Sequence, residues 1–235
     1  MHDITNEIIQ MDWDNGFSKY FNELDNRGVI VQAGGHHGLY PKLLSKLFKT
    51  VYTFEANENS FKILSENIKD CENVIATNAA LSDEDGVKIY GWLPFENNTG
   101  SFKVSKNKGD IDSITIDSLD LEECDVIWLD IELHELYALK GAVNTIRKFK
   151  PIIMCEGPEA TGYEVNEFLM ECGYIQTGRV NNESVFESED KKLNEVNEVK
   201  ILIAVPTNKY VESETFKSIY DLAIPDSVET EIQFF

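Results

Sequence analysis

A repeated alternation of short apolar runs and amphipathic stretches constrains the fold of this chain more than any other feature. The run GVIVQAGG at 28–35 closes in glycines and precedes LYPKLLSKLF, whose apolar residues recur at helical spacing. The same order of strand and helix is repeated downstream by TVYTFEA, NSFKILSENIKD and NVIATNAAL. The alternation predicts an α/β domain with a mostly parallel sheet and right-handed crossovers.

The alternation is interrupted once, between 82 and 118. Turn signals there separate short β-rich pieces, so we expect an inserted hairpin or lid. Beyond it we expect a strand, a helix, a strand and a helix, over 124–132, 134–149, 150–157 and 162–173. Two further strand-like runs flank Asn181-Asn182, which predicts an antiparallel hairpin at the end of the sheet.

Length, charge and composition exclude several classes of protein. The 235 residues suffice for one sizeable domain with a short appendage. A formal net charge of −21 would repel a phosphate backbone, so we expect no nucleic-acid partner. The apolar runs are of strand length and the N-terminus lacks a signal-peptide layout, so we expect a cytoplasmic protein without a membrane span. The 4 cysteines form no C-x-x-C pair, which favours reduced, buried thiols.

Ligands of such sheets bind at the carboxyl ends of the strands. Gly34, Gly35 and Gly38 occupy the first strand-to-helix turn, where the missing Cβ lets backbone approach a ligand. Glu55 ends the second strand, where a carboxylate accepts hydrogen bonds from ribose hydroxyls. Together they indicate a nucleoside-type cofactor without separating S-adenosylmethionine (SAM) from NAD; a purely structural turn and a solvated glutamate are the alternatives.

A second group of acidic residues follows the later strands. Asp130 and Glu132 point to the same face, Glu135 follows at a helix start, and Glu156 ends the next strand. Crowded carboxylates raise the pKa of one another or attract a cation, so they are candidates for a base that assists proton removal from a hydroxyl. Asp130, Glu132 and Glu156 are the candidate ligands of a divalent cation, although the pattern does not require one. Alternatively, Glu135 caps its helix and Glu156 is solvated.

These residues resemble the FkbM family of SAM-dependent methyltransferases. The similarity covers about 29–188, and its most specific piece is Asp130-x-Glu132-x-x-Glu135 followed by Leu139-Lys140-Gly141-Ala142. The resemblance implies a Rossmann-like class I methyltransferase fold, SAM as cofactor, and O-methylation of sugars, glycans or other small hydroxylated acceptors. The terminal antiparallel hairpin fits this fold better than the NAD-binding one.

The resemblance also implies individual roles. Glu55 would hold the ribose, and the adenine would lie against Asn78, Ala79 and Ala80. Gln32 and His36 stand where the family usually has aspartate and asparagine, and both can still hydrogen-bond near the methionine part of SAM. Asp130 would take part in cofactor binding as well. Asp130, Glu132 and His134 are the candidate bases, with His134 as a plain helix N-terminal residue as the alternative. Leu133 replaces a family glycine.

The two ends of the chain are expected to lie outside this domain. Residues 1–28 are expected to be a helical segment, and 189–199 a charged linker. Residues 200–235 resemble the strand-helix-strand start of a GT-A glycosyltransferase, which suggests a truncated fusion or an appendage, and a glycosyltransferase partner. Two other functions remain open: a degenerate, non-catalytic domain in a glycan-modifying assembly, and an NAD-dependent oxidoreductase, which the missing G-x-G-x-x-G spacing disfavours.

Overall fold

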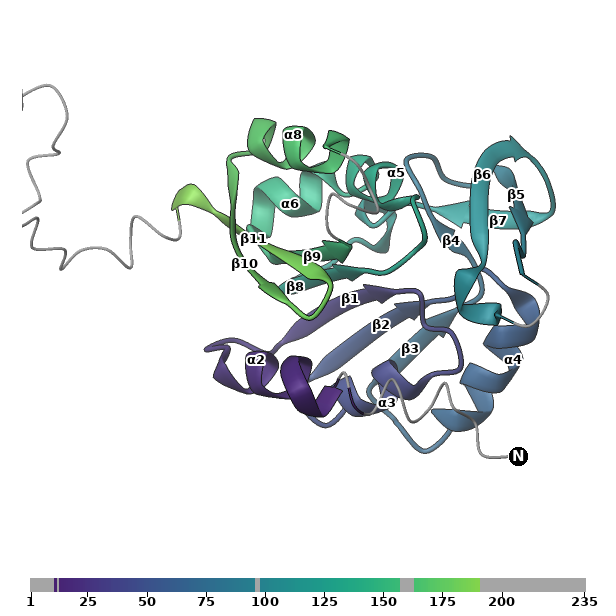
Figure 1. The fold of residues 1–235 in the computed structure, drawn as a ribbon, viewed down its shortest axis with the longest axis horizontal. Helices are drawn as coiled ribbons and strands as arrows, with labels where there is room; N and C mark the ends of the chain where they lie inside the picture. The colour runs from purple at the N-terminus through teal and green to yellow at the C-terminus, as the bar shows by residue number, and fades with distance from the viewer. Residues whose placement is uncertain (1–10, 12, 96–97, 157–162, 191–235) are drawn as a thin grey trace, which may run out of the picture. The chain divides into compact units, whose positions relative to one another are not determined.

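In the part of the chain that the computed structural model describes, which is residues 11, 13–95, 98–156 and 163–190, the central sheet has seven strands (Figure 1). Their spatial order is β10-β11-β9-β8-β1-β2-β3. The pairs among β9, β8, β1, β2 and β3 are parallel, whereas β11 pairs antiparallel with both β9 and β10. The α/β fold and its terminal hairpin are therefore confirmed. The strands are β1 (Val29–Ala33), β2 (Thr50–Phe54), β3 (Val74–Thr77), β8 (Val126–Leu129), β9 (Ile152–Glu156), β10 (Tyr174–Val180) and β11 (Glu183–Ser188).

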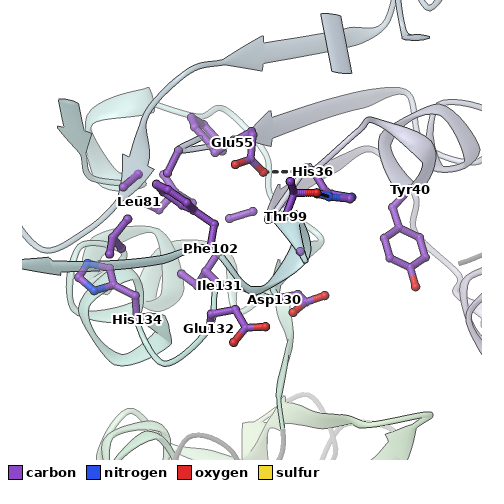
Figure 2. A pocket seen from close by; sticks show the side chains of 18 of the residues that line it. His36, Tyr40, Glu55, Leu81, Thr99, Phe102, Asp130, Ile131, Glu132 and His134 are labelled. Atoms are coloured by element: carbon purple, nitrogen blue, oxygen red, sulfur yellow. Dashed lines mark hydrogen bonds between the residues drawn. The ribbon is translucent and has the colours of Figure 1, made fainter. Parts of the chain in front are cut away.

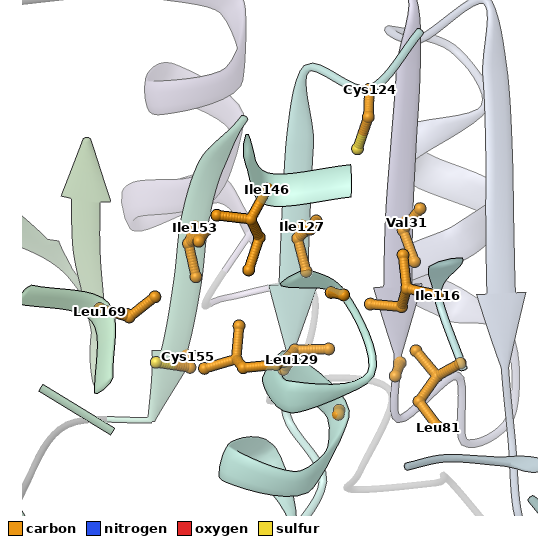
Figure 3. Packing of buried hydrophobic residues seen from close by; sticks show 14 of the residues in the cluster. Val31, Leu81, Ile116, Cys124, Ile127, Leu129, Ile146, Ile153, Cys155 and Leu169 are labelled. Atoms are coloured by element: carbon orange, nitrogen blue, oxygen red, sulfur yellow. The ribbon is translucent and has the colours of Figure 1, made fainter. Parts of the chain in front are cut away.

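Helices cover both faces of this sheet (Figure 1). On one side, α5 (Glu135–Lys140), α6 (Val143–Phe149) and α8 (Glu164–Glu171) pack on the sheet through a cluster that includes Ile127, Leu129 and Ile153 (Figure 3). On the other side, α2 (Ser18–Glu23) and α3 (Leu39–Leu44) pack against Ile30 and Trp128. The strands of the middle of the sheet are buried on both faces, as their continuous apolar runs predicted. The remaining long helix, α4 (Glu58–Asn67), connects β2 to β3.

The prediction of a single helix over 134–149 is wrong, because the helix is interrupted between α5 and α6. A Cβ on Gly141 would lie 2.0 Å from the carbonyl oxygen of Ser82, so a glycine is needed where the two segments cross. The break also frees the carbonyl of Gly141, which accepts a hydrogen bond from the backbone N–H of Asp117 at 2.9 Å. The Asp117 carboxylate in turn accepts from the backbone N–H of Thr145 at 2.8 Å and caps α6.

The expected third strand is also divided in two. β3 stays in the central sheet, and β4 (Ala80–Leu81) begins a second sheet of order β4-β7-β5-β6. The other strands of this sheet come from the insert predicted at 82–118: β5 (Lys88–Trp92), β6 (Lys103–Lys108) and β7 (Ile111–Ile114). The short 3-10 helix η2 (Thr99–Ser101) lies between β5 and β6, and η3 (Asp117–Leu119) follows β7. The insert is therefore a small sheet anchored to the main domain, and more than the expected hairpin.

The described part of the N-terminal segment contains the helices η1 (Trp13–Phe17) and α2, whereas residues 24–28 are not helical. Their aromatic rings pack on the core, with the ring centroids of Phe17 and Trp128 4.5 Å apart. By internal contacts the chain divides into residues 1–188 and residues 189–235. The predicted linker and glycosyltransferase-like segment lie almost entirely outside the described residues.

Two further findings concern cysteines and membranes. The thiols of Cys71, Cys124, Cys155 and Cys172 are free. Cys124 and Cys155 are buried as predicted, whereas Cys71 and Cys172 are only partly buried. Among the described residues, no helix has both the length and the apolar character that crossing a bilayer requires.

Candidate functional site

A cavity of about 260 Å³ opens at the carboxyl ends of β1, β2 and β8. This volume is just below the ~300–1,000 Å³ typical of small-molecule pockets. The cavity is lined by the turn after β1, the end of β2, the start of β4, the loop after β8 and, from the insert, residues of η2 and β6. Figure 2 shows Glu55, His36, Thr99, Asp130 and Glu132 around this space. The cavity therefore lies where the sequence placed the ligand.

The glycine turn after β1 is tied to the end of β2. The backbone N–H groups of Gly34 and Gly35 both donate to the carbonyl oxygen of Phe54, at 3.0 and 2.9 Å. Gly34 and Gly38 have φ of +85° and +84°, a region that other residues reach only with strain. A Cβ on Gly35 would lie 2.5 Å from Leu64 Cδ1, so this glycine lets α4 pack closely. Gly34 and Gly35 line the cavity, and Gly38 shapes the turn behind it.

Glu55 follows β2 and is nearly buried at the edge of the cavity. One carboxylate oxygen, Oε2, accepts from the backbone N–H of His36, and the other, Oε1, accepts from that of Asn57, both at 2.7 Å. Burial raises the pKa of Glu55, while these two hydrogen bonds act in the opposite direction. The carboxylate is thus fixed against the glycine turn, and each oxygen keeps accepting capacity for a ligand hydroxyl.

The other residues that the resemblance assigned to the cofactor divide into two groups. Ala79 and Ala80 line the cavity, but Asn78 and Gln32 are not among its lining residues. Asn78 donates from Nδ2 to the carbonyl oxygen of Glu55 at 2.7 Å. Gln32 is fully buried, and its Oε1 accepts from Thr53 Oγ1 at 2.6 Å. The structure places Asn78 and Gln32 behind the wall that carries Glu55.

His36 connects the glycine turn to the insert. Its backbone binds Glu55, and its Nε2 lies 2.8 Å from Thr99 Oγ1 in η2. The His36 ring also stacks on that of His37, with centroids 3.8 Å apart. Thr99 is a cavity residue that the sequence did not single out, because only the folded insert brings η2 to the glycine turn.

Carboxylates crowd together at the ends of β8 and β9. Burial, followed by the charges of Glu156 and Glu135, raises the pKa of Asp130 to about 7. Burial also raises the pKa of Glu135 to about 7, although its Oε1 accepts from the backbone N–H of Ile131 at 3.1 Å. Glu183, which the sequence did not single out, joins this group because the register of β11 places it opposite Glu156. Burial and the charge of Asp130 raise its pKa as well.

The loop after β8 carries two strained residues. Glu132 and Leu133 have φ of +56° and +78°, and such strain in non-glycine residues gathers at functional sites. Glu132 lines the cavity, and its Oε2 lies 3.3 Å from Nζ of Lys103 in β6. Leu133 is 53% exposed and does not line the cavity. Lys103 therefore neutralises part of an acidic wall and holds the insert beside it.

His134 lines the cavity from the other end of the same loop and is buried. Its Nε2 lies 3.1 Å from Ser82 Oγ, and its ring stacks on that of Tyr137 at 4.8 Å. Burial lowers the pKa of His134 to about 4; the charge of Asp83 opposes this shift and that of Lys106 adds to it. The imidazole is therefore neutral at pH 7, so it can accept a proton or a hydrogen bond.

The structure does not gather the candidate metal ligands into a coordination set. Within the described ranges, no group of three or more histidine, cysteine, aspartate or glutamate side chains is arranged to hold a metal ion, the trio Asp130, Glu132 and Glu156 included. The residues present therefore do not form a cation site at the carboxylate cluster.

The Methyltransferase FkbM domain family matches residues 32–175. This chain belongs to the FkbM methyltransferase family. The match runs from β1 to β10 and contains the whole cavity, including the insert. No curated protein matches the sequence.

The chain is similar to several solved structures, of which a methyltransferase FkbM shares its fold at a TM-score above 0.5. The methyltransferase FkbM from Methylobacillus flagellatus KT is 16% identical, with a TM-score of 0.51, over 71% of this chain and 45% of that one. This chain thus spans less than half of that protein. An rRNA methylase from Streptococcus thermophilus is 15% identical, with a TM-score of 0.46, over 73% of this chain and 94% of its own. A Streptococcus mutans protein in complex with SAH is 14% identical, with a TM-score of 0.46, over 72% of this chain and 93% of that one.

The FkbM family supports SAM as the methyl donor, and the residues of the cavity fit such a cofactor. Glu55 can accept from ribose hydroxyls. Glu132, and Asp130 where it is ionised above its pKa of about 7, give the opposite wall a partial negative charge that suits a sulfonium cation. The positive φ of Leu133 also explains why the family usually has glycine there, because glycine takes this conformation without strain.

Proposed function

We propose that this chain is a SAM-dependent methyltransferase that methylates an oxygen of a small hydroxylated acceptor, most suitably a sugar or a glycan. The observation that carries the proposal is the fixed position of Glu55, whose carboxylate is bound by the backbone of the glycine turn at the cavity edge. A carboxylate held there is preorganised for the ribose of a nucleoside cofactor. Membership of the FkbM family supports SAM as that cofactor.

The chain's own residues would bind and align the two substrates. Glu55 would hold the ribose, with Ala79 and Ala80 beside the adenine and Gly34, Gly35 and His36 near the methionine part. When bound, SAM supplies a methyl group that is already activated for displacement by a nucleophile. Most of the catalytic effect would then come from alignment of the acceptor oxygen in the cavity, part of whose wall is the insert.

The charge of the cavity supports a neutral acceptor. Asp130, Glu132 and Glu55 line it, and among the residues that the structure describes no lysine or arginine does. An anionic acceptor would meet these carboxylates, with Lys103 as the nearby partner of Glu132. Neutral hydroxylated molecules such as sugars avoid this repulsion, and they hydrogen-bond to carboxylate and imidazole acceptors.

Calorimetric titration with S-adenosylhomocysteine (SAH), with NAD in parallel, tests the cofactor. We expect micromolar binding of SAH, no binding of NAD, and at least a tenfold loss of SAH affinity in Glu55→Gln. Glu72→Gln removes the same charge from an exposed position outside the cavity and should bind as the wild type does. Absence of SAH binding to folded wild-type protein would overturn the proposal and favour a non-catalytic domain, whereas binding of NAD alone would favour an oxidoreductase.

A screen of neutral glycosides with isotope-labelled SAM then tests the acceptor. Transfer of label to a hydroxyl oxygen, located by NMR or mass spectrometry of the product, is the expected result. Label found only on nitrogen or carbon acceptors would contradict O-methylation while leaving the cofactor assignment intact.

A further inference from the structure

A chain of hydrogen bonds runs from the cavity-lining His134 through Ser82 and Asp83 to Lys106 on the insert. Nε2 of His134 lies 3.1 Å from Ser82 Oγ, which donates to Asp83 Oδ1 at 3.1 Å. Nζ of Lys106 lies 2.6 Å from the same Asp83 oxygen and 3.5 Å from Glu84 Oε2. His134 and Ser82 are each 1% exposed, so little water competes for the first two links.

The direction of each hydrogen bond between His134, Ser82 and Asp83 follows from which groups carry a proton. A serine hydroxyl carries one proton, and the ionised Asp83 can only accept. Desolvation raises the pKa of Asp83, but the hydrogen bonds from Lys106 and Ser82 outweigh it and hold the pKa below its usual range. Because a charged acceptor binds a hydroxyl proton more strongly than a neutral imidazole does, the Ser82 proton points to Asp83. The hydroxyl oxygen is then the acceptor, and Nε2 of His134 must be the donor.

We propose that Ser82 and Asp83 hold neutral His134 as the Nε2–H tautomer, which leaves Nδ1 as a lone-pair acceptor for a hydroxyl in the cavity. Nδ1 makes no hydrogen bond to any residue in the described part of the chain, whereas Nε2 is occupied by Ser82. The Tyr137 ring stacks on the imidazole and restricts its rotation. Ser82 and Asp83 are positioning residues in this arrangement, because they act on the acceptor only through His134.

The role of Nδ1 in methyl transfer rests on the proposed function. As the new C–O bond forms, the S–C bond breaks and its electron pair stays on sulfur, while the hydroxyl proton passes from oxygen to Nδ1. An alkylated oxygen that still carries its proton is far more acidic than a free hydroxyl. A buried imidazole is therefore basic enough to take this proton once the new bond is largely formed, and it orients the hydroxyl before that.

Nitrogen-15 NMR of the ligand-free protein tests the tautomer directly. Long-range 1H–15N correlations distinguish a protonated ring nitrogen from one that bears a lone pair, and a His134→Gln variant assigns the signals among the 4 histidines. We expect a protonated Nε2 and a lone pair on Nδ1 in the wild type. Ser82→Ala and Asp83→Asn should shift the population toward the other tautomer, and Ser82→Thr, which keeps a hydroxyl, should restore it.

The exposed Ser65 on α4 provides the control, since Ser65→Ala removes a hydroxyl that binds only its own helix. A wild-type protein with Nδ1 protonated, or a Ser82→Ala variant with unchanged His134 signals, would overturn the proposal. Because no cofactor or acceptor is present, this result is independent of SAH binding. A protein that failed to bind SAH would contradict the proposed function and leave the tautomer to be decided by the same spectra.

Discussion

Gly34 lies directly against the backbone of Asp130, so that a Cβ on Gly34 would be 2.0 Å from the Asp130 carbonyl oxygen. Both residues follow neighbouring strands, β1 and β8, and both line the cavity. The same glycine has a φ of +85°. Two constraints therefore apply to Gly34. The turn needs a residue with positive φ, and the loop after β8 leaves no room for a side chain.

Gly34→Ala is expected to destabilise the protein strongly and to abolish SAH binding. Positive φ alone costs about 1–2 kcal/mol in alanine, and the clash must move the loop that carries Asp130. Gly173→Ala is the matched control, because Gly173 also has positive φ (+78°) but nothing lies within 4 Å of its Cβ position. Thermal unfolding should show a larger loss for Gly34→Ala. Equal losses for the two variants would mean that backbone strain, and not the contact with Asp130, sets the requirement.

Stability should fall as the pH rises through neutrality, because Asp130 and Glu135 bind protons more tightly in the folded chain. Their folded pKa values of about 7 exceed the ordinary values of 3.8 and 4.5, so their contribution is complete below about pH 4 and is lost as pH passes 7. Asp130→Asn removes one of these groups. We expect its melting temperature to exceed that of the wild type at pH 8.5 by several degrees and by much less at pH 5.5.

The exposed Glu171 on α8 gives the control for this titration, since Glu171→Gln makes the same kind of change away from the cluster. Its melting temperature should follow that of the wild type at both pH values. If the melting temperature of Asp130→Asn differs from that of the wild type by the same amount at pH 5.5 and 8.5, the Asp130 carboxylate does not titrate in this window.

Much of the fold could be predicted from the sequence because its signals are local. The run 126–129 is apolar throughout and 29–33 is apolar except for Gln32, as is typical of strands buried on both faces, and Asn181-Asn182 marks the hairpin turn. The break between α5 and α6 could not be predicted in this way. It depends on the close approach of Gly141 to Ser82, two residues far apart in the chain, and helical periodicity continues unchanged across it.

The sequence predicted the residues of the candidate site best where a residue lies at the end of a predicted strand. Gly34, Glu55 and Asp130 all lie at strand ends and all line the cavity. Residues brought in by the tertiary fold were missed: Thr99 depends on how the insert folds, and Glu183 on the register of β11 with β9. The position of Glu183 could have been predicted from the hairpin turn, because a turn at Asn181-Asn182 puts the next residue at the strand end where Glu156 lies.

Charge should control the choice of acceptor. If the cavity repels anions through Asp130 and Glu132, a neutral glycoside should be methylated with at least about tenfold higher kcat/KM than its uronic-acid counterpart, a difference of ~1.4 kcal/mol. Glu132→Gln should narrow this ratio by relieving the repulsion. Steady-state kinetics with the neutral and the acidic acceptor measures this ratio of kcat/KM values in the wild type and the variant. An acidic acceptor that is preferred, and whose preference depends on Lys103, would reverse this assignment and make the lysine an anion-binding group.

Two polar contacts at the cavity join η2 and β6 of the insert to the main domain, His36 Nε2 with Thr99 Oγ1 at 2.8 Å and Lys103 with Glu132 at 3.3 Å. A Thr99→Val/Lys103→Met double variant should loosen this wall without unfolding the core, which contains neither residue. We expect SAH affinity to fall about three- to tenfold and hydrogen exchange across β6 to accelerate. Lys88→Met breaks an ion pair that lies wholly within the insert and is the control. Unchanged exchange and affinity in the double variant would show that apolar packing of Phe102 and Val104, not these polar contacts, holds the insert at the cavity.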